Sequence, residues 1–155
     1  MANTAGLCQS FKKDILNGVH AFSVATGGKG TTDTFYGALY SASASPSLTP
    51  TTVTTYTATA GELANGNGYT TGGQVITNAV APNTTTGTAY WTPSANLSWT
   101  AFTATAFDTL LIYNNTVSGK NAVGIFTFAS QTITAGTFTL TMPTNDSTNA
   151  LIRIA

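Results

Sequence analysis

The chain has 155 residues, a length that fits one domain whose core is large enough to fold without disulfides or bound metals. Only 6% of the residues are charged, and five basic and five acidic side chains cancel, which disfavours binding to nucleic acid or to an anionic membrane. Hydrophobic residues make up 42% of the chain, a composition that excludes intrinsic disorder.

The N-terminal segment, residues 1–9, lacks the basic region and apolar run of a signal peptide. No stretch of the chain approaches the roughly 20 apolar residues of a membrane span. We therefore expect a protein that is made in a cytoplasm and that stays soluble or assembles. A surface with so few charges resists aggregation weakly, so we expect partner proteins to cover part of it.

The N-terminal region is the one segment with a helical pattern, which predicts an amphipathic helix over about residues 7–19. The apolar positions that recur every four residues are Leu7, Phe11, Ile15 and Val19, with Leu16 beside them, and the polar face holds Ser10, Lys12, Lys13 and Asp14. The apolar stripe must cover either the end of a sheet or a neighbouring subunit. Asn17-Gly18 is a suitable helix end, because glycine readily adopts a left-handed conformation.

From Phe35 onward the pattern changes to short β-like runs separated by segments rich in Gly, Pro, Asn and Ser. The predicted strands are residues 34–40, 52–59, 74–79, 88–92, 98–104, 108–113, 122–128, 137–142 and 151–154. The helical crossovers that parallel strands need are missing. The sequence therefore predicts a single all-β domain over residues 1–155, an antiparallel, jelly-roll-like β-sandwich with one N-terminal amphipathic α-helix.

The titratable side chains do not form a recognisable catalytic or metal site. His20 is the only histidine, and Cys8 lies about three helical turns away from it, roughly 18 Å, too far for a nucleophile and its base. One Cys and one His also exclude a zinc site. Asp108 lies in an apolar run, where we expect it to satisfy a backbone donor or to pair with Lys120 or Arg153. We therefore expect no enzyme activity and no cofactor.

Two other segments have a functional and a structural interpretation. The glycine-rich loop at residues 27–31 lacks the order of a phosphate-binding loop, because Gly30 separates the lysine from the threonine and the helix precedes the loop. The aromatic residues Tyr90, Trp91 and Trp99 can stack on a glycan, although core packing is the favoured interpretation for Trp99.

Five ordered stretches along the chain resemble a known group of proteins. They are residues 10–12 with 15–20, 33–35 with 38–40, 66–73, 111–114, and 136–139 followed by Met142-Pro143. In this order they resemble a family of small virion structural proteins of tailed bacteriophages, encoded beside the major capsid protein. The resemblance spans almost the whole chain and implies a capsid decoration, or cement, protein on the head surface of the virion.

This resemblance implies the major capsid protein and further copies of the same chain as partners, in a homo-oligomer. The alternative that stays open is a tail, neck or fibre component that binds host glycans. The residues we expect to contact partners are Leu7, Phe11 and Ile15 on the helix, Gly28 and Lys29 in the first glycine-rich loop, and Asn67 and Tyr69 in the second.

Overall fold

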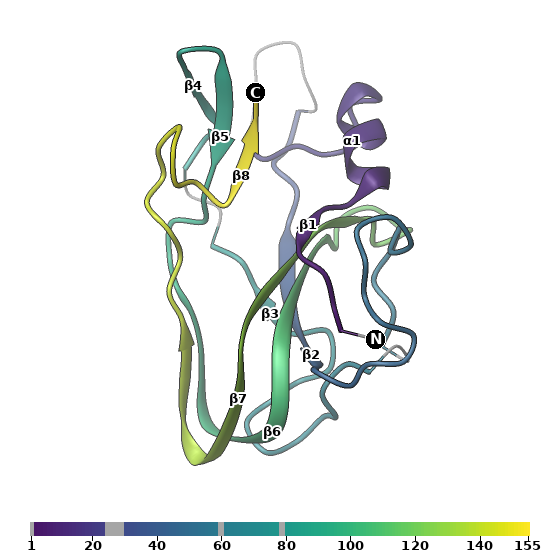
Figure 1. Ribbon diagram of the computed structural model, residues 1–155. Coiled ribbons are helices and arrows are strands. Elements are labelled where there is room, and N and C mark those ends of the chain that lie inside the picture. Colours follow the sequence, from purple (N-terminus) through teal and green to yellow (C-terminus); the bar gives the residue numbers. More distant parts are fainter. Residues whose placement is uncertain (1, 24–29, 59–60, 78–79) are drawn as a thin grey trace.

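A long antiparallel hairpin, formed by β6 (Leu97–Asn114) and β7 (Ala122–Leu140), organises the fold (Figure 1). The computed structural model describes residues 2–23, 30–58, 61–77 and 80–155. The hairpin is the centre of a five-stranded sheet of order β1-β7-β6-β2-β3. The three remaining strands of this sheet are β1 (Gly6–Leu7), β2 (Phe35–Ser41) and β3 (Gln74–Val75). All four pairings in the sheet are antiparallel.

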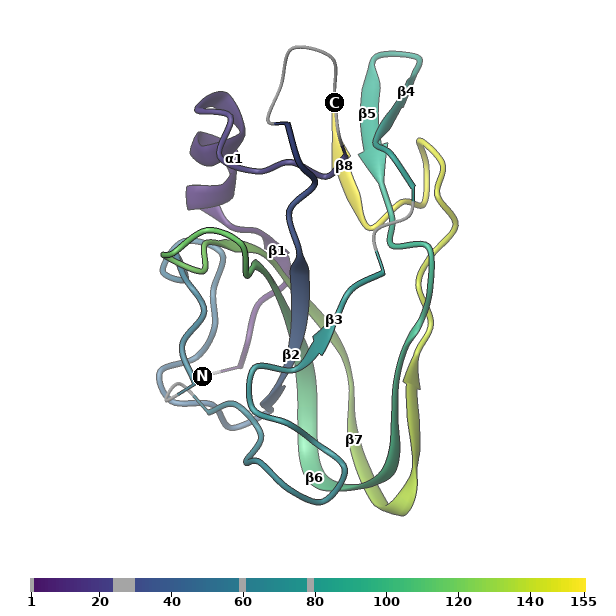
Figure 2. The ribbon, with the colours of Figure 1, turned by 180° about the vertical axis from the view of Figure 1, so that it is seen from behind.

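The hairpin bends sharply near its middle and folds back over itself, so that its two halves face each other (Figures 1 and 2). One half of β6 pairs with β2 from Phe107 to Asn114, and the other half returns across the core. Leu97 in the returning half packs against Gly37 of β2, where an added Cβ would meet the Leu97 side chain at 2.7 Å. The result is a sandwich-like arrangement, which confirms the predicted all-β class.

Residues in the left-handed conformation accompany this bend. They are Ala101, Ala106 and Ala135, with φ of 49°, 49° and 47°, and the β6–β7 register shifts near them. Each such bulge adds a residue to one strand and changes which face the following side chains occupy. Trp99, Phe102 and Phe107 therefore all point into the core, although their spacing departs from period two.

A second antiparallel sheet of order β4-β5-β8 closes one end of the sandwich. Its strands are β4 (Asn83–Thr85), β5 (Thr88–Trp91) and β8 (Ile152–Ile154). The helix α1 (Gln9–Leu16) lies at the same end of the molecule (Figure 1). One cluster of buried residues runs from Cys8 to Ile152 and joins both sheets and the helix.

The structure corrects several predicted boundaries. The helix starts at Gln9 because Gly6 and Leu7 pair with β7 as β1, and it ends at Leu16, followed by Gly18 with a φ of 66°. The predicted strand at 52–59 is wrong, because its described residues form only an isolated bridge at Thr55. The two predicted strands at 98–104 and 108–113 are one bent strand, β6.

β7 likewise joins the predicted strands at 122–128 and 137–142. The described part of the chain contains no helix long and apolar enough to cross a membrane.

Candidate functional site

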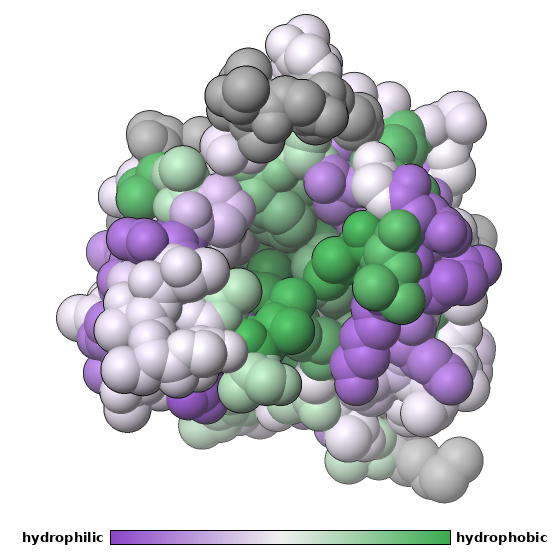
Figure 3. Space-filling view, turned by 90° about the horizontal axis from the view of Figure 1, so that it is seen from above, coloured by the Kyte–Doolittle hydropathy of each residue, from purple (hydrophilic) through white to green (hydrophobic). Residues whose placement is uncertain are grey.

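A groove opens between α1 and β8 at the end of the molecule, which Figure 3 shows from above. It has a volume of about 490 Å³ and is lined by Leu7, Lys12, Ile15, Leu16, Arg153, Ile154 and Ala155. Hydrophobic side chains surround the hollow in this view, with polar ones at its margin. We call it the α1/β8 groove.

The orientation of α1 explains why the groove is apolar. Phe11 and Asp14 face the core, whereas Ile15 is 36% exposed and Leu16 is 87% exposed. The expected division of the helix into an apolar inner face and a polar outer face is therefore only partly realised. The carboxylate of Asp14 is buried on the inner side, and it turns the apolar side chains of the last helical turn toward solvent.

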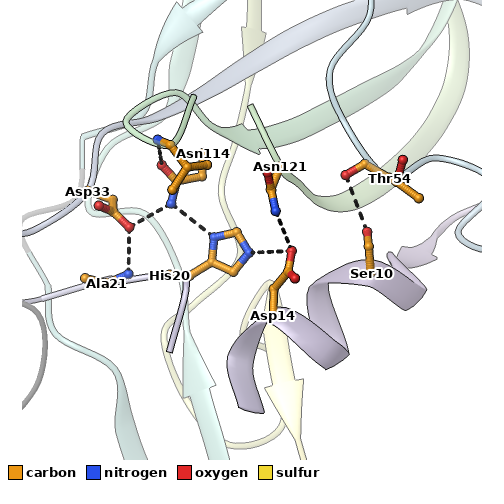
Figure 4. A network of polar contacts seen from close by, with 9 residues as sticks. Ser10, Asp14, His20, Ala21, Asp33, Thr54, Asn114 and Asn121 are labelled. Atoms are coloured by element: carbon orange, nitrogen blue, oxygen red, sulfur yellow. Dashed lines mark hydrogen bonds and ion pairs between the residues drawn. The ribbon is translucent and has the colours of Figure 1, made fainter. Parts of the chain in front are cut away.

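A chain of polar contacts holds α1 in this orientation (Figure 4). The Asn121 side-chain amide donates to the Asp14 carboxylate at 2.7 Å, and Nε2 of His20 lies 3.7 Å from the same oxygen. The Asn114 amide nitrogen lies 3.1 Å from Nδ1 of His20. Because an amide NH₂ can only donate, His20 Nδ1 is the acceptor, and the proton of the neutral ring lies on Nε2, toward Asp14.

The same network continues to a second buried carboxylate. The Asn114 amide also donates to Asp33 at 2.7 Å, and the backbone N–H of Ala21 donates to the same Asp33 oxygen at 2.8 Å. Asp33 is 2% exposed, so this carboxylate is satisfied inside the protein. A pocket of about 160 Å³ reaches His20, but its other lining side chains, among them Phe11, Phe22 and Trp91, are mainly apolar. The network links α1 to the β6–β7 hairpin through hydrogen bonds.

Glu62 forms a second cluster of ionisable side chains and is not among the residues that line the groove. Its carboxylate accepts hydrogen bonds from the Tyr56 hydroxyl at 2.6 Å, the Tyr69 hydroxyl at 2.7 Å and the Gly72 N–H at 2.6 Å. Burial, together with the Glu62 charge, raises the pKa of Tyr56, Tyr69 and Tyr113 far above the ordinary value. The phenols thus remain protonated donors, and the cluster anchors the loop that contains Glu62.

The structure places two of the three helix-region contact residues at the groove. Leu7, which belongs to β1, and Ile15 both line it. Phe11, which we also expected to contact a partner, is only 1% exposed, and the centre of its ring lies 5.1 Å from that of His20. Leu7 and Ile15 are thus accessible at the groove, whereas Phe11 belongs to the core.

The structure describes the predicted contact residues of the second glycine-rich loop, Asn67 and Tyr69. Tyr69, which we expected to contact a partner, is 3% exposed, and its hydroxyl also accepts from the Leu39 N–H, so its side chain belongs to the core. Asn67 is exposed in a tight turn with a φ of 52°, and its carbonyl accepts from the Thr103 N–H at 2.9 Å. The predicted contacts Gly28 and Lys29 lie outside the described residues.

The other candidate residues have structural roles. Trp91 and Trp99 are 2% and 1% exposed, so neither indole presents a face to a glycan. Asp108 accepts from the Asn3 side-chain amide at 3.1 Å instead of pairing with Lys120 or Arg153. In the described part of the chain, no group of three or more His, Cys, Asp or Glu side chains is placed to hold a metal ion.

Sequence reasoning did not identify Lys12 and Arg153 as neighbours, because 141 positions separate them and only the fold brings them to one groove. The one local signal is the alternation Ile152-Arg153-Ile154, which places a cation on an otherwise apolar strand. Comparison with family models, with curated proteins and with solved structures finds no match to this chain.

Proposed function

We propose that the chain is a non-enzymatic structural protein of a tailed-bacteriophage virion, which binds the shell of the head and stabilises it as a decoration protein. The observation that carries the proposal is the α1/β8 groove. Leu16 and Ile154 are 87% and 45% exposed there, next to the cations Lys12 and Arg153. Exposed apolar side chains with a polar rim are typical of protein interaction sites.

The state of the ionisable side chains also favours a structural role. A carboxylate-based hydrolase needs two acidic groups that converge on a cleft open to substrate. Asp14 and Asp33 are buried and accept hydrogen bonds from side-chain amides, and Glu62 accepts from two phenols and a backbone N–H. Asp14 and Asp33 join distant segments of the chain and Glu62 holds a local loop, as expected for structural roles.

The test is to locate the chain in virions and to measure its effect on the head. Particles of a phage that encodes this chain are compared with particles from which its gene is deleted, by immunogold labelling and by the temperature at which DNA is released. We expect label on the head and earlier DNA release from the deleted particles. Label confined to the tail, or equal heat resistance, would contradict the proposal, and tail label would favour a tail or fibre component.

A further inference from the structure

The acidic and the basic side chains of the chain differ in their surroundings, although the net charge is zero. The carboxylate side chains of the described residues accept hydrogen bonds from their own chain. The pairs are Asp14 with Asn121, Asp33 with Asn114, Glu62 with Tyr56 and Tyr69, Asp108 with Asn3, and Asp146 with Asn149. The carboxylates therefore act mainly as hydrogen-bond acceptors within the chain.

The described cations lie on the surface. Lys12, Lys13, Lys120 and Arg153 are all exposed, and no lysine or arginine in the described part of the chain forms an ion pair. Lys12 and Arg153 line the α1/β8 groove, and Lys13 follows Lys12 on α1. Lys120 lies elsewhere, with its Nζ 5.1 Å from the centre of the Tyr56 ring. The lining of the groove thus contains two cationic side chains and no acidic side chain.

The floor of the groove is apolar. Three of the five large hydrophobic side chains that are exposed in the described chain belong to it, namely Ile15, Leu16 and Ile154. Leu7 adds a fourth apolar group from β1. A partner must therefore supply apolar side chains for the floor and negative charge for the rim.

β8 also offers a free strand edge beside the groove. β8 is the last strand of the sheet β4-β5-β8 and pairs with β5 through Ile152, Arg153 and Ile154. No strand of the described chain pairs with its other edge, and Arg153 and Ile154 of this strand line the groove. A free strand edge of this kind binds an extended segment by main-chain hydrogen bonds, and pockets beside it select alternate side chains.

We infer that the α1/β8 groove binds an extended segment of the head shell protein, in which acidic and apolar side chains alternate, as a new strand along the free edge of β8. The inference rests on the proposed function and adds the chemistry of the partner and the place where it binds. The acidic side chains lie against Lys12, Lys13 and Arg153, and the apolar ones against Ile15, Leu16 and Ile154.

Charge argues against a second copy of the chain as the occupant. A two-fold symmetric contact through β8 would bring the same patch of both copies together. Lys12 and Arg153 would then face their own equivalents, no acidic side chain lines the groove to compensate, and juxtaposed like charges oppose association. An acidic segment meets no such repulsion.

The experiment measures binding of the full chain to purified heads that lack it, by co-sedimentation. One groove variant reverses charge, Lys12→Glu with Arg153→Glu, and another removes apolar surface, Leu16→Ser with Ile154→Ser. The matched controls are Lys120→Glu and Val75→Ser, which change an exposed cation and a 53% exposed apolar residue elsewhere. We expect each groove variant to weaken binding by about tenfold or more, and each control to bind as the unchanged chain does.

Each outcome is decisive. If the unchanged chain does not bind heads, the proposed function fails. If it binds and the groove variants bind equally well, or the controls lose as much, the function stands and the inference is overturned. Circular dichroism and thermal unfolding establish that the variants fold. Should they not fold, hydrogen exchange of the unchanged chain decides: slower exchange of the β8 amides on heads supports the inference, and unchanged exchange overturns it.

The same variants test self-association. We expect the free chain to show no association through the groove in sedimentation velocity. A dimer that is lost in the Leu16→Ser, Ile154→Ser variant but kept in Val75→Ser would assign the groove to a second copy and overturn the inference.

Discussion

Asn121, immediately before β7, donates a hydrogen bond of 2.7 Å to the buried carboxylate of Asp14 on α1. This contact joins residues that are 107 positions apart and fixes the face that the helix presents to the groove. Nε2 of His20 lies 3.7 Å from the same carboxylate, so one acidic side chain serves two partners. The shape of the candidate interaction surface thus depends on a polar contact beneath it.

Replacing this carboxylate tests its contribution to stability. Asp14→Ala leaves the Asn121 amide without its acceptor in the interior, and we expect the free energy of unfolding to fall by about 2–3 kcal/mol. Asp14→Asn keeps one acceptor oxygen and is expected to lose less. Lys13→Ala, at the exposed neighbouring position, is the control and changes stability by less than about 0.5 kcal/mol. Urea denaturation measures the free energy of unfolding of all three variants. An equal loss for Asp14→Ala and Lys13→Ala would show that the hydrogen bond between Asn121 and Asp14 does not stabilise the fold.

Glu62 offers a second test of a carboxylate that acts as a hydrogen-bond acceptor. Glu62→Gln replaces one oxygen by an NH₂ group, which cannot accept from Tyr56, Tyr69 or the Gly72 N–H. We expect a loss of about 2–4 kcal/mol, because hydrogen bonds to charged groups are worth about 1.5–3 kcal/mol each and a buried donor is left unpaired. Tyr56→Phe removes only one of these bonds and is expected to cost less in the same denaturation experiment. A Glu62→Gln protein as stable as the unchanged chain would rule out this role.

Alkaline pH is expected to destabilise the protein through its buried tyrosines and its cysteine. Burial raises the pKa of Cys8 from 9.0 to about 12, and burial with the Glu62 charge raises the pKa of Tyr40 and Tyr69 far above 10.0. The unfolded chain loses these protons at lower pH than the folded chain does. The stability that these groups contribute is therefore complete below about pH 9 and is lost as the pH rises through 9–12.

Two measurements check this dependence. Tyrosinate absorbance should develop at higher pH in the folded chain than in denaturant, and the unfolding midpoint in urea should fall as the pH is raised above 9. Cys8, which is fully buried, should react with a thiol reagent only after unfolding. Rapid labelling of Cys8 in the folded chain at neutral pH would contradict the buried position.

At the bend of the hairpin we expect a substitution that raises the free energy of unfolding. Ala106 has a φ of 49°, a conformation that costs a non-glycine residue roughly 1–2 kcal/mol. Ala106→Gly removes this strain against an entropic cost of about 0.5–1 kcal/mol, so we expect stability to rise by about 0.5 kcal/mol. Ala104→Gly, at a position of the same strand without positive φ, should lower it. A loss of stability for Ala106→Gly equal to that for Ala104→Gly would argue against the bulge.

The sequence predicted the class of the fold because strand signals are local. The alternation around Phe138 and Leu140 and the turn residues along the chain indicate strands wherever they occur. The bent ribbon was missed for a physical reason. Bulges at Ala101 and Ala106 shift the alternation within one strand, so a period-two pattern divides β6 into two separate strands.

The groove was only partly predictable. Helical periodicity selected Ile15, which lines the groove, but it also selected Phe11, which is buried, since periodicity cannot distinguish a core face from an exposed one when the helix is short. The inward position of Asp14 depends on Asn121, a partner far away in the sequence. α1 and β8 line the same groove only because the tertiary fold brings them together, and no local sequence pattern indicates this.

A cryo-EM map of the head, at a resolution that shows strands, tests the central claim most directly. We predict that the chain lies on the shell with the α1/β8 groove against it, and that an extended segment of the shell protein continues the sheet β4-β5-β8 beside β8. A chain bound to the shell with the groove open to solvent would contradict the inferred binding mode. A head whose shell carries no density for the chain would contradict the proposed function itself.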